Sequence, residues 1–151
     1  MQLFQSFSKF LLEVSGVKRE QLECFAADCQ TILSGKDLGN CMELCQIQYN
    51  GEFEITHYKG DANLLLAHIV SWLEDNDPYR FQADLPDPKL EVSPEDRNLV
   101  NVDLTIAFEE SIIVRRDPEG PISWNGEKWA VCPLDIDVAE ELENMDGKSN
   151  A

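Results

Sequence analysis

The sequence predicts an α+β protein in which a mostly antiparallel sheet is packed by two helices, at about residues 2–14 and 61–76. Two observations carry this prediction. Residues 100–109 alternate, with large apolar side chains at even positions and mainly polar ones at odd positions, and residues 61–76 form the most apolar helical pattern of the chain. Because successive strand side chains point to opposite faces, the alternation indicates a long strand with one wet face.

The first helix is indicated by apolar residues that recur at helical spacing, namely Leu3, Phe7, Phe10, Leu11 and Val14. Gly16 follows this stretch and suits the left-handed residue that ends many helices. The sequence therefore predicts an amphipathic helix over 2–14.

Residues 22–34 leave two interpretations open. The segment is either a hairpin that turns at Asp28-Cys29-Gln30, or one helix with an apolar stripe that runs from Leu22 to Leu33. Propensity alone does not decide between the two.

Residues 41–58 carry apolar side chains at odd positions, and this parity continues across Asn50-Gly51. A hairpin with a three-residue loop that ends at Gly51 explains the parity, and so does a single long strand with a bulge or bend at Gly51. A two-residue turn is disfavoured because it would pair Gln48 with Phe53.

The second helix follows Gly60, and Asp61 is a suitable N-cap residue. Its apolar residues cover more than a narrow stripe, so we expect it to be buried on more than one side. Asn76-Asp77-Pro78 ends it, because proline lacks an N–H and restricts the residue before it.

Residues 77–98 form a proline-rich connector. Long connectors are unusual inside compact domains and often carry an interaction. We therefore take Asp84 and Asp87 as candidate protein contacts. Residues 89–92 are expected to form a short edge strand within this stretch.

The last structured part is expected to contain a strand over 112–114 and a hairpin about Asn125-Gly126 that places Ile122 opposite Trp129. Trp124 and Trp129 lie on this hairpin. Tryptophan is enriched at interface hot spots, so the pair is a candidate protein-contact patch, with ordinary packing as the alternative.

The net charge of −17 over 151 residues limits the partners. It disfavours nucleic acids and anionic membranes, although solubility alone is another explanation. We expect one domain over 1–132 and an acidic, flexible tail over 133–151. No signal peptide and no membrane span is expected.

The sequence shows little of the chemistry that a catalytic or metal site needs. Five cysteines without a Cys-x-x-Cys pair favour free thiols in a reducing cytoplasm and no metal site. No glycine-rich phosphate loop and no nucleophile elbow is present.

We expect His57 to be a partly buried structural residue and His68 to be packed or exposed. The alternative is a small enzyme that acts through one of them. We therefore expect no catalytic residue, no cofactor and no enzyme activity.

Two segments together resemble a known family. One is a Gly60-Asp61 helix start followed by Trp72-Leu73 and then Pro78. The other is Val102-Asp103-Leu104, running to Glu110-Ser111-Ile112-Ile113-Val114. Over residues 40–116 their order and spacing resemble the phage tail completion protein R family of Peduovirus-type contractile-tailed phages and prophages. The chain departs from the family pattern at Asp28-Cys29-Gln30, where members often have a glycine-centred turn, and at Asn50-Gly51.

The resemblance implies a tail-terminator-like virion morphogenesis protein that acts at the head-proximal end of the tail and allows head–tail joining. It implies a ring of copies, a hexamer, that contacts the tail tube and the head-neck or head completion proteins. The protein would be located at the neck end of the virion tail after assembly in the host cytoplasm. In such a ring, Asn101 and Asp103 would face the tube lumen or a neighbouring subunit. The alternative is a cytoplasmic adaptor or assembly chaperone that binds a basic partner.

Overall fold

The structure is a computed structural model that describes residues 1–133, and it confirms the predicted α+β class. Its helices are α1 (Gln2–Ser15), the 3-10 helix η1 (Arg19–Gln21) and α2 (Ala62–Asn76). Its strands are β1 (Leu22–Asp37), β2 (Cys41–Tyr58), β3 (Lys89–Pro94), β4 (Val100–Arg116), β5 (Ile122–Trp124) and β6 (Glu127–Val131).

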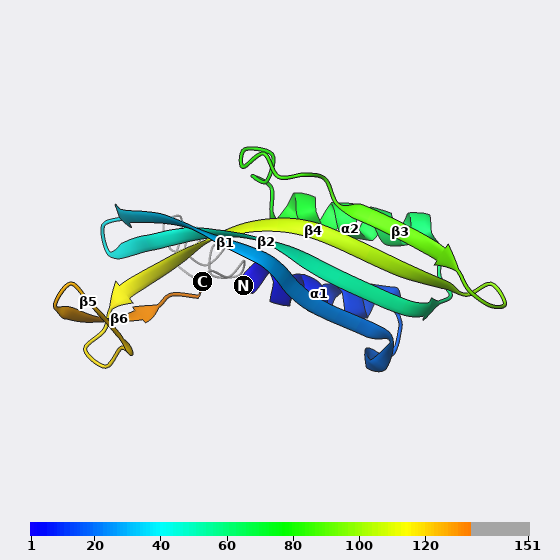
Figure 1. Cartoon of the computed structure of the whole chain (residues 1–151), viewed down its shortest axis with the longest axis horizontal. Helices are drawn as coiled ribbons and strands as arrows, with labels where there is room; N and C mark the ends of the chain where they lie inside the picture. Colours follow the sequence, from blue (N-terminus) through cyan, green and yellow to red (C-terminus); the bar gives the residue numbers. More distant parts are fainter. Residues whose placement is uncertain (134–151) are drawn as a thin grey trace, which may run out of the picture. The chain divides into compact units, whose positions relative to one another are not determined.

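The six strands form one sheet in the order β1-β2-β4-β6-β5, and β3 also pairs with β4 (Figure 1). Strand β3 pairs antiparallel with the first part of β4, so the predicted edge strand at 89–92 is confirmed. Strand β6 pairs with the last residues of β4. The chain divides into two compact units, one containing residues 3–29 and 48–109, and one containing residues 30–47 and 110 onward.

In the first unit, α1 and α2 both cover the same face of the sheet (Figure 1). An aromatic cluster around Phe7 forms the centre of the core. The fully buried ring of Phe7 lies 5.0 Å from Phe53, 5.1 Å from Trp72 and 6.4 Å from Phe108, measured between ring centroids. Aromatic rings at these separations attract one another in addition to burying apolar area.

The predicted ends of both helices are confirmed. Gly16 follows α1 with a φ of 68°, a left-handed conformation that glycine adopts without a Cβ clash. Asp61 caps α2, because its Oδ1 accepts a hydrogen bond of 3.0 Å from the backbone N–H of Asn63. The N–H of Asp77 still donates to the carbonyl of Leu73 where α2 ends.

Strand β2 is a single strand, which confirms the second of the two interpretations of residues 41–58. Gly51 is needed for close approach: a Cβ at this position would lie 2.9 Å from Phe53 Cζ and 3.1 Å from Phe108 Cε2. The Asn-Gly pair therefore does not turn the chain, and its glycine makes room for two core rings.

Both interpretations of residues 22–34 are wrong, because this segment belongs to one uninterrupted strand, β1. Asp28 has a φ of 55°, so the turn signal at Asp28-Cys29-Gln30 produces one left-handed residue inside the strand. Aspartate tolerates this conformation better than most residues. The strand lies next to β2 in the sheet, and the chain does not reverse within it.

The separate strand expected over 112–114 is also wrong, because β4 runs without a break from Val100 to Arg116. Its even positions remain on the covered face, where Glu110 is buried. The Oε1 atom of Glu110 accepts a hydrogen bond of 2.9 Å from the backbone N–H of Gln2. A buried carboxylate with such a donor can occupy a core position, so the acidic pair at 109–110 does not end the strand.

In the second unit, β5 and β6 form the predicted hairpin, with Ile122 paired to Trp129. Asn125 and Gly126 have φ angles of 55° and 77°, as expected for the two central residues of a type I′ turn. Apart from Pro133, the predicted tail over 133–151 lies outside the described residues.

Candidate interaction surface

The first unit carries a hollow between α2 and the connector that follows it. The hollow has a volume of about 520 Å³ and lies among residues of α2 and of 77–88, including Leu66, Val70, Leu73, Phe81 and Leu85. We call these residues, together with the exposed Tyr79, Glu74 and Asp87, the α2–connector surface.

Arg80 holds the connector in its folded form. Its Nη1 lies 2.9 Å from Oδ2 of Asp77, and its Nη2 donates a hydrogen bond of 3.0 Å to the carbonyl of Pro86. Both charged side chains are largely buried, with 14% of each exposed. The backbone N–H of Leu85 also donates to the carbonyl of Arg80. These contacts turn a proline-rich stretch into a fixed loop.

The α2–connector surface exposes large apolar side chains. Tyr79 is 68% exposed and Phe81 is 72% exposed. Helix α2 buries Leu65, Ile69 and Leu73, whereas Leu64, Leu66 and Val70 are exposed. The expectation that α2 is buried on more than one side is therefore wrong for the described residues. The wide apolar pattern instead supplies both a core face and an exposed face.

The charged groups on this surface are mainly acidic. Glu74 and Asp87 line the hollow, and neither forms an ion pair within residues 1–133. Arg80 is the basic residue of the lining, and Asp77 already neutralises it. Asp84 is exposed in the same loop with a φ of 57°. The predicted contacts Asp84 and Asp87 thus lie in the connector beside an apolar hollow.

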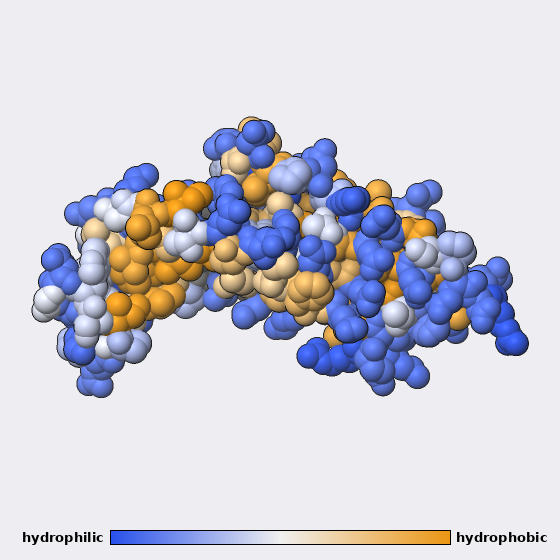
Figure 2. All heavy atoms as spheres, viewed as in Figure 1, coloured by the Kyte–Doolittle hydropathy of each residue, from blue (hydrophilic) through white to orange (hydrophobic). Residues whose placement is uncertain are grey.

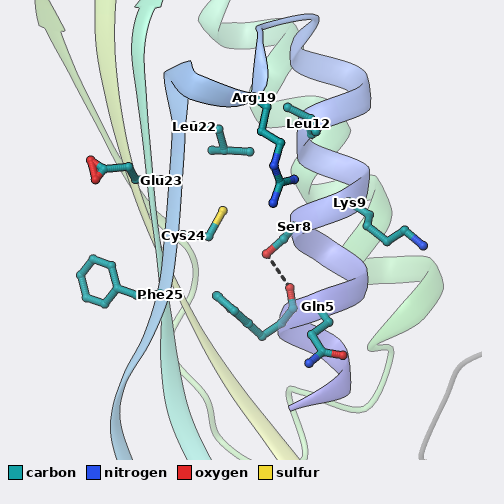
Figure 3. A pocket seen from close by; sticks show the side chains of 10 residues that line it. Gln5, Ser8, Lys9, Leu12, Arg19, Leu22, Glu23, Cys24 and Phe25 are labelled. Carbon is teal, nitrogen blue, oxygen red and sulfur yellow. Dashed lines mark hydrogen bonds between the residues drawn. The ribbon is translucent and has the colours of Figure 1, made fainter.

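A second hollow of about 750 Å³ lies between α1 and the start of β1 (Figure 3). The side chains of Leu22 and Cys24 point from β1 toward α1, whereas Glu23 and Phe25 point to the opposite side. On the helix, Ser8 uses its hydroxyl to donate to the carbonyl of Phe4 at 2.8 Å, so it has a local partner. Burial raises the pKa of the Cys24 thiol, which makes Cys24 a poor nucleophile.

The uncovered face of the sheet in the first unit is polar, as the alternation of β4 predicted. Hydrophilic atoms predominate over β3 and the neighbouring part of β4 (Figure 2). Two cross-strand hydrogen bonds join β2 to β4 here: Gln48 Nε2 to Glu109 Oε2 at 2.6 Å, and Thr105 Oγ1 to Glu52 Oε1 at 2.8 Å. From the first bond to the second, the residue number rises from 48 to 52 on β2 and falls from 109 to 105 on β4, as expected for antiparallel strands.

Of the two β4 residues predicted as contacts, Asn101 has a structural partner. Its Oδ1 accepts a hydrogen bond of 3.2 Å from the backbone N–H of His57. Asp103 is exposed and pairs in register with Glu91 of β3. Two acidic residues side by side give this part of the face a negative potential.

The two tryptophans of the second unit contact each other. Their ring centroids lie 5.0 Å apart, and Nε1 of Trp129 donates a hydrogen bond of 2.8 Å to the carbonyl of Trp124. Trp129 is buried, and the guanidinium of Arg116 lies 5.3 Å from its ring centroid. In the described residues, Trp129 therefore packs within the hairpin, and Trp124 is half-buried.

The expectation for His57 is wrong, since its side chain is 56% exposed and its Nδ1 lies 3.1 Å from Oε1 of Glu95. The backbone φ of His57 is 56°, which shifts the alternation by one residue, so that Tyr58 is buried instead. His68 is half-buried, and its ring lies 6.4 Å from that of Phe10.

All five cysteines are free thiols, and Sγ of Cys41 lies 4.0 Å from Sγ of Cys132. Within residues 1–133 no group of three His, Cys, Asp or Glu side chains is placed to hold a metal ion. Neither helix of this range has the length and apolar character needed to span a bilayer.

The sequence prediction missed the apolar part of the α2–connector surface. Tyr79, Phe81, Leu66 and Val70 were not taken as contact residues. The available signal was the combination of a helix that is apolar on several sides with aromatic residues in the connector directly after it. One side of α2 packs against the sheet, and this packing does not account for the apolar residues on the other side.

The comparisons with known proteins decide the family. A family model described as P2 phage tail completion protein R (GpR) matches residues 1–133, which is most of the chain. The chain belongs to the phage tail completion protein R family. The match begins at the first residue, so the family relationship includes α1 and β1 as well as the region of the sequence resemblance.

A relative of this chain comes from Haemophilus phage HP1 (strain HP1c1). It is described as an uncharacterized 19.2 kDa protein in the rep-hol intergenic region, and it is 29% identical over 110 residues. The aligned part covers 69% of this chain and 64% of the relative, so the chain spans less than two thirds of that relative. No solved structure matches the chain.

Proposed function

We propose that this chain completes the phage tail at its head-proximal end and makes the tail competent to join a head. The observation that carries the proposal is membership of the tail completion protein R family over residues 1–133. The Haemophilus phage relative supports a phage origin, and its description adds no activity. The protein would be a component of the virion tail at the neck.

We propose that several copies assemble into a ring, a hexamer by family resemblance, on the last layer of the tail tube. The open sheet supports self-assembly. Strand β1 is an edge strand, and an edge strand exposes unpaired N–H and C=O groups to a partner chain. Three large apolar side chains on it are also exposed, Phe25 at 59%, Ile32 at 45% and Leu33 at 85%. Stepwise photobleaching of a fluorescently labelled chain on isolated tail ends would count the copies, and a single copy per tail would contradict the ring.

We propose that the negative surface lets DNA pass the ring without adhering to it. The support is the net charge of −17 and the exposed acidic residues on the uncovered sheet face and in the connector. The proposal predicts that charge reversal of Glu91 and Asp96 to lysine, two exposed residues of the connector outside the α2–connector surface, lowers infectivity. Unchanged infectivity in the reversed protein would contradict this role.

We propose that the chain acts by binding and not by catalysis. The two histidines support this, because His57 is exposed beside Glu95 and His68 packs against Phe10. A base needs an orienting partner and a reachable substrate; Glu95 can orient His57, but neither His57 nor His68 lines either of the two hollows described above. The double variant His57→Ala/His68→Ala should still complement a phage that lacks the gene.

The experiment that tests the main proposal is deletion of the gene from a phage that encodes this chain. Electron microscopy of the lysate should show full heads and separate tails, with few joined particles. The wild-type chain supplied in trans should restore joined particles and infectivity. Tails of normal length that join heads without the chain would disprove the proposal.

A further inference from the structure

We propose that the α2–connector surface is a docking site for an apolar, positively charged segment of another protein, with the chemistry of an amphipathic helix rich in leucine and lysine. The proposal rests on the proposed tail function in one respect, because that function places the partner at the head-proximal end of the tail. The surface itself is defined by the structure of the first unit.

The shape of the surface favours an inserted apolar side. Leu66 and Val70 on α2, together with Leu85 and the exposed Phe81 on the connector, line a hollow of about 520 Å³, and the exposed Tyr79 stands between the lining residues Pro78 and Arg80 in the sequence. A water-exposed Phe81 has an unfavourable hydration free energy, which a partner removes by covering it. Amphipathic helices commonly place apolar side chains in grooves of this kind.

The surface is also built in advance of binding. The Arg80 guanidinium joins Asp77 at the end of α2 to the carbonyl of Pro86, and prolines at 78, 86 and 88 restrict the loop further. A connector already held in shape loses little conformational entropy when a partner binds. This arrangement fits a recognition surface better than it fits a mere link between α2 and β3.

The charges select the partner. Arg80 is neutralised by Asp77, whereas Glu74 and Asp87 at the hollow and Asp84 in its loop are not ion-paired within the described residues. A segment with lysine or arginine beside its apolar stripe would compensate these charges. The same surface of a second copy is disfavoured as the occupant, because such a contact would place Glu74, Asp84 and Asp87 of one copy against the same carboxylates of the other.

The test measures binding of defined peptides to the purified full-length chain by fluorescence anisotropy at physiological salt. Three probes of equal length are compared: one of leucine and lysine, one of leucine and glutamate, and one of serine and lysine. We expect binding of the leucine–lysine probe only. The serine–lysine probe separates recognition from general attraction to an acidic protein.

Variants locate the binding site. Phe81→Ser and the double change Glu74→Lys/Asp87→Lys should each weaken binding of the leucine–lysine probe about tenfold or more, as expected for a central aromatic anchor and its compensating charges. Val131→Ser is the control, because Val131 is also exposed, at 54%, but lies on β6 in the second unit. Equal affinity of all variants, or equal binding of the serine–lysine probe, would overturn the proposal.

A phage arm separates this inference from the proposed function. If the wild-type chain restores joined particles to a deletion phage and Phe81→Ser does not, while Val131→Ser does, the surface is required for the tail role. If all three restore them, the docking proposal is wrong and the tail role stands. If the wild-type chain itself does not restore joined particles, the proposed function is wrong. The peptide-binding experiment then still tests the docking site.

Discussion

Nη1 of Arg80 lies 2.9 Å from Oδ2 of Asp77, and this ion pair joins the end of α2 to the loop that follows it. The pair is mostly shielded from water, because 14% of each side chain is exposed. The second nitrogen of the same guanidinium donates to the carbonyl of Pro86. One side chain therefore fixes both ends of residues 77–86.

Removing this clamp should loosen the connector. In Arg80→Ala, the carboxylate of Asp77 and the carbonyl of Pro86 both lose a charged donor, so we expect a loss of about 1.5–3 kcal/mol in the free energy of unfolding. Amide hydrogen exchange should speed up at residues 80–85 more than in the core strands. Exchange that increases uniformly along the chain would show that the clamp is not local.

Gly51 should not tolerate a side chain. In Gly51→Ala the new Cβ meets Phe53 at 2.9 Å and Phe108 at 3.1 Å, so the core rings must move. We expect a loss of about 1–3 kcal/mol, typical of overpacking, in urea unfolding. Glu54→Ala on the same strand is the control, because Glu54 is exposed and its loss should change stability by less than about 0.5 kcal/mol. Equal stability of both variants would contradict the close approach.

The Glu43–Ser111 contact should make stability depend on pH. The Ser111 hydroxyl donates to Oε1 of Glu43 at 2.7 Å and, with a contribution from Ser34, lowers the pKa of Glu43 from its ordinary value of 4.5. A lowered pKa stabilises the folded chain above about pH 4.5, and this stability is lost as the pH falls through the lowered value. Ser111→Ala should therefore cost about 1 kcal/mol at pH 7 and less at pH 3. A cost that is equal at both pH values would exclude the ionised carboxylate as its source.

The cysteines should differ in reactivity. Burial raises the pKa of the Cys24 and Cys41 thiols above the ordinary 9.0, so both form less of the reactive thiolate near pH 8. Cys29 is exposed. Timed alkylation with iodoacetamide, followed by peptide mass spectrometry, should label Cys29 first. Labelling of Cys24 or Cys41 at the rate of Cys29 would contradict these environments.

Local patterns were sufficient for much of the fold. The spacing in residues 2–14, the N-cap Asp61 and the Asn125-Gly126 turn each predicted an element that the structure contains. These features are decided by neighbours in the sequence. The alternation in β4 also predicted correctly which face is buried, because that face is set by the period of two.

The errors occurred where a distant residue decides the outcome. Asp28-Cys29-Gln30 looks like a turn, but pairing of β1 with β2 keeps the strand continuous. Glu110 looks like a strand end, but the N–H of Gln2 satisfies its carboxylate. In the candidate site, the composition of the connector led to the prediction of Asp84 and Asp87, which lie in the loop that borders the hollow. Tyr79 and Phe81 became evident only once Arg80 was seen to fold that loop beside the exposed side of α2.

The most direct measurement of the central claim is the location of this chain in the finished particle. Gold-labelled antibody against the chain, applied to tails that have not yet joined heads, should label one end of each tail, opposite the fibres and baseplate. It should not label tails from the deletion phage. Label at the baseplate end or along the whole tube would contradict a completion role at the head-proximal end. Purified tails that carry no label would contradict it as well.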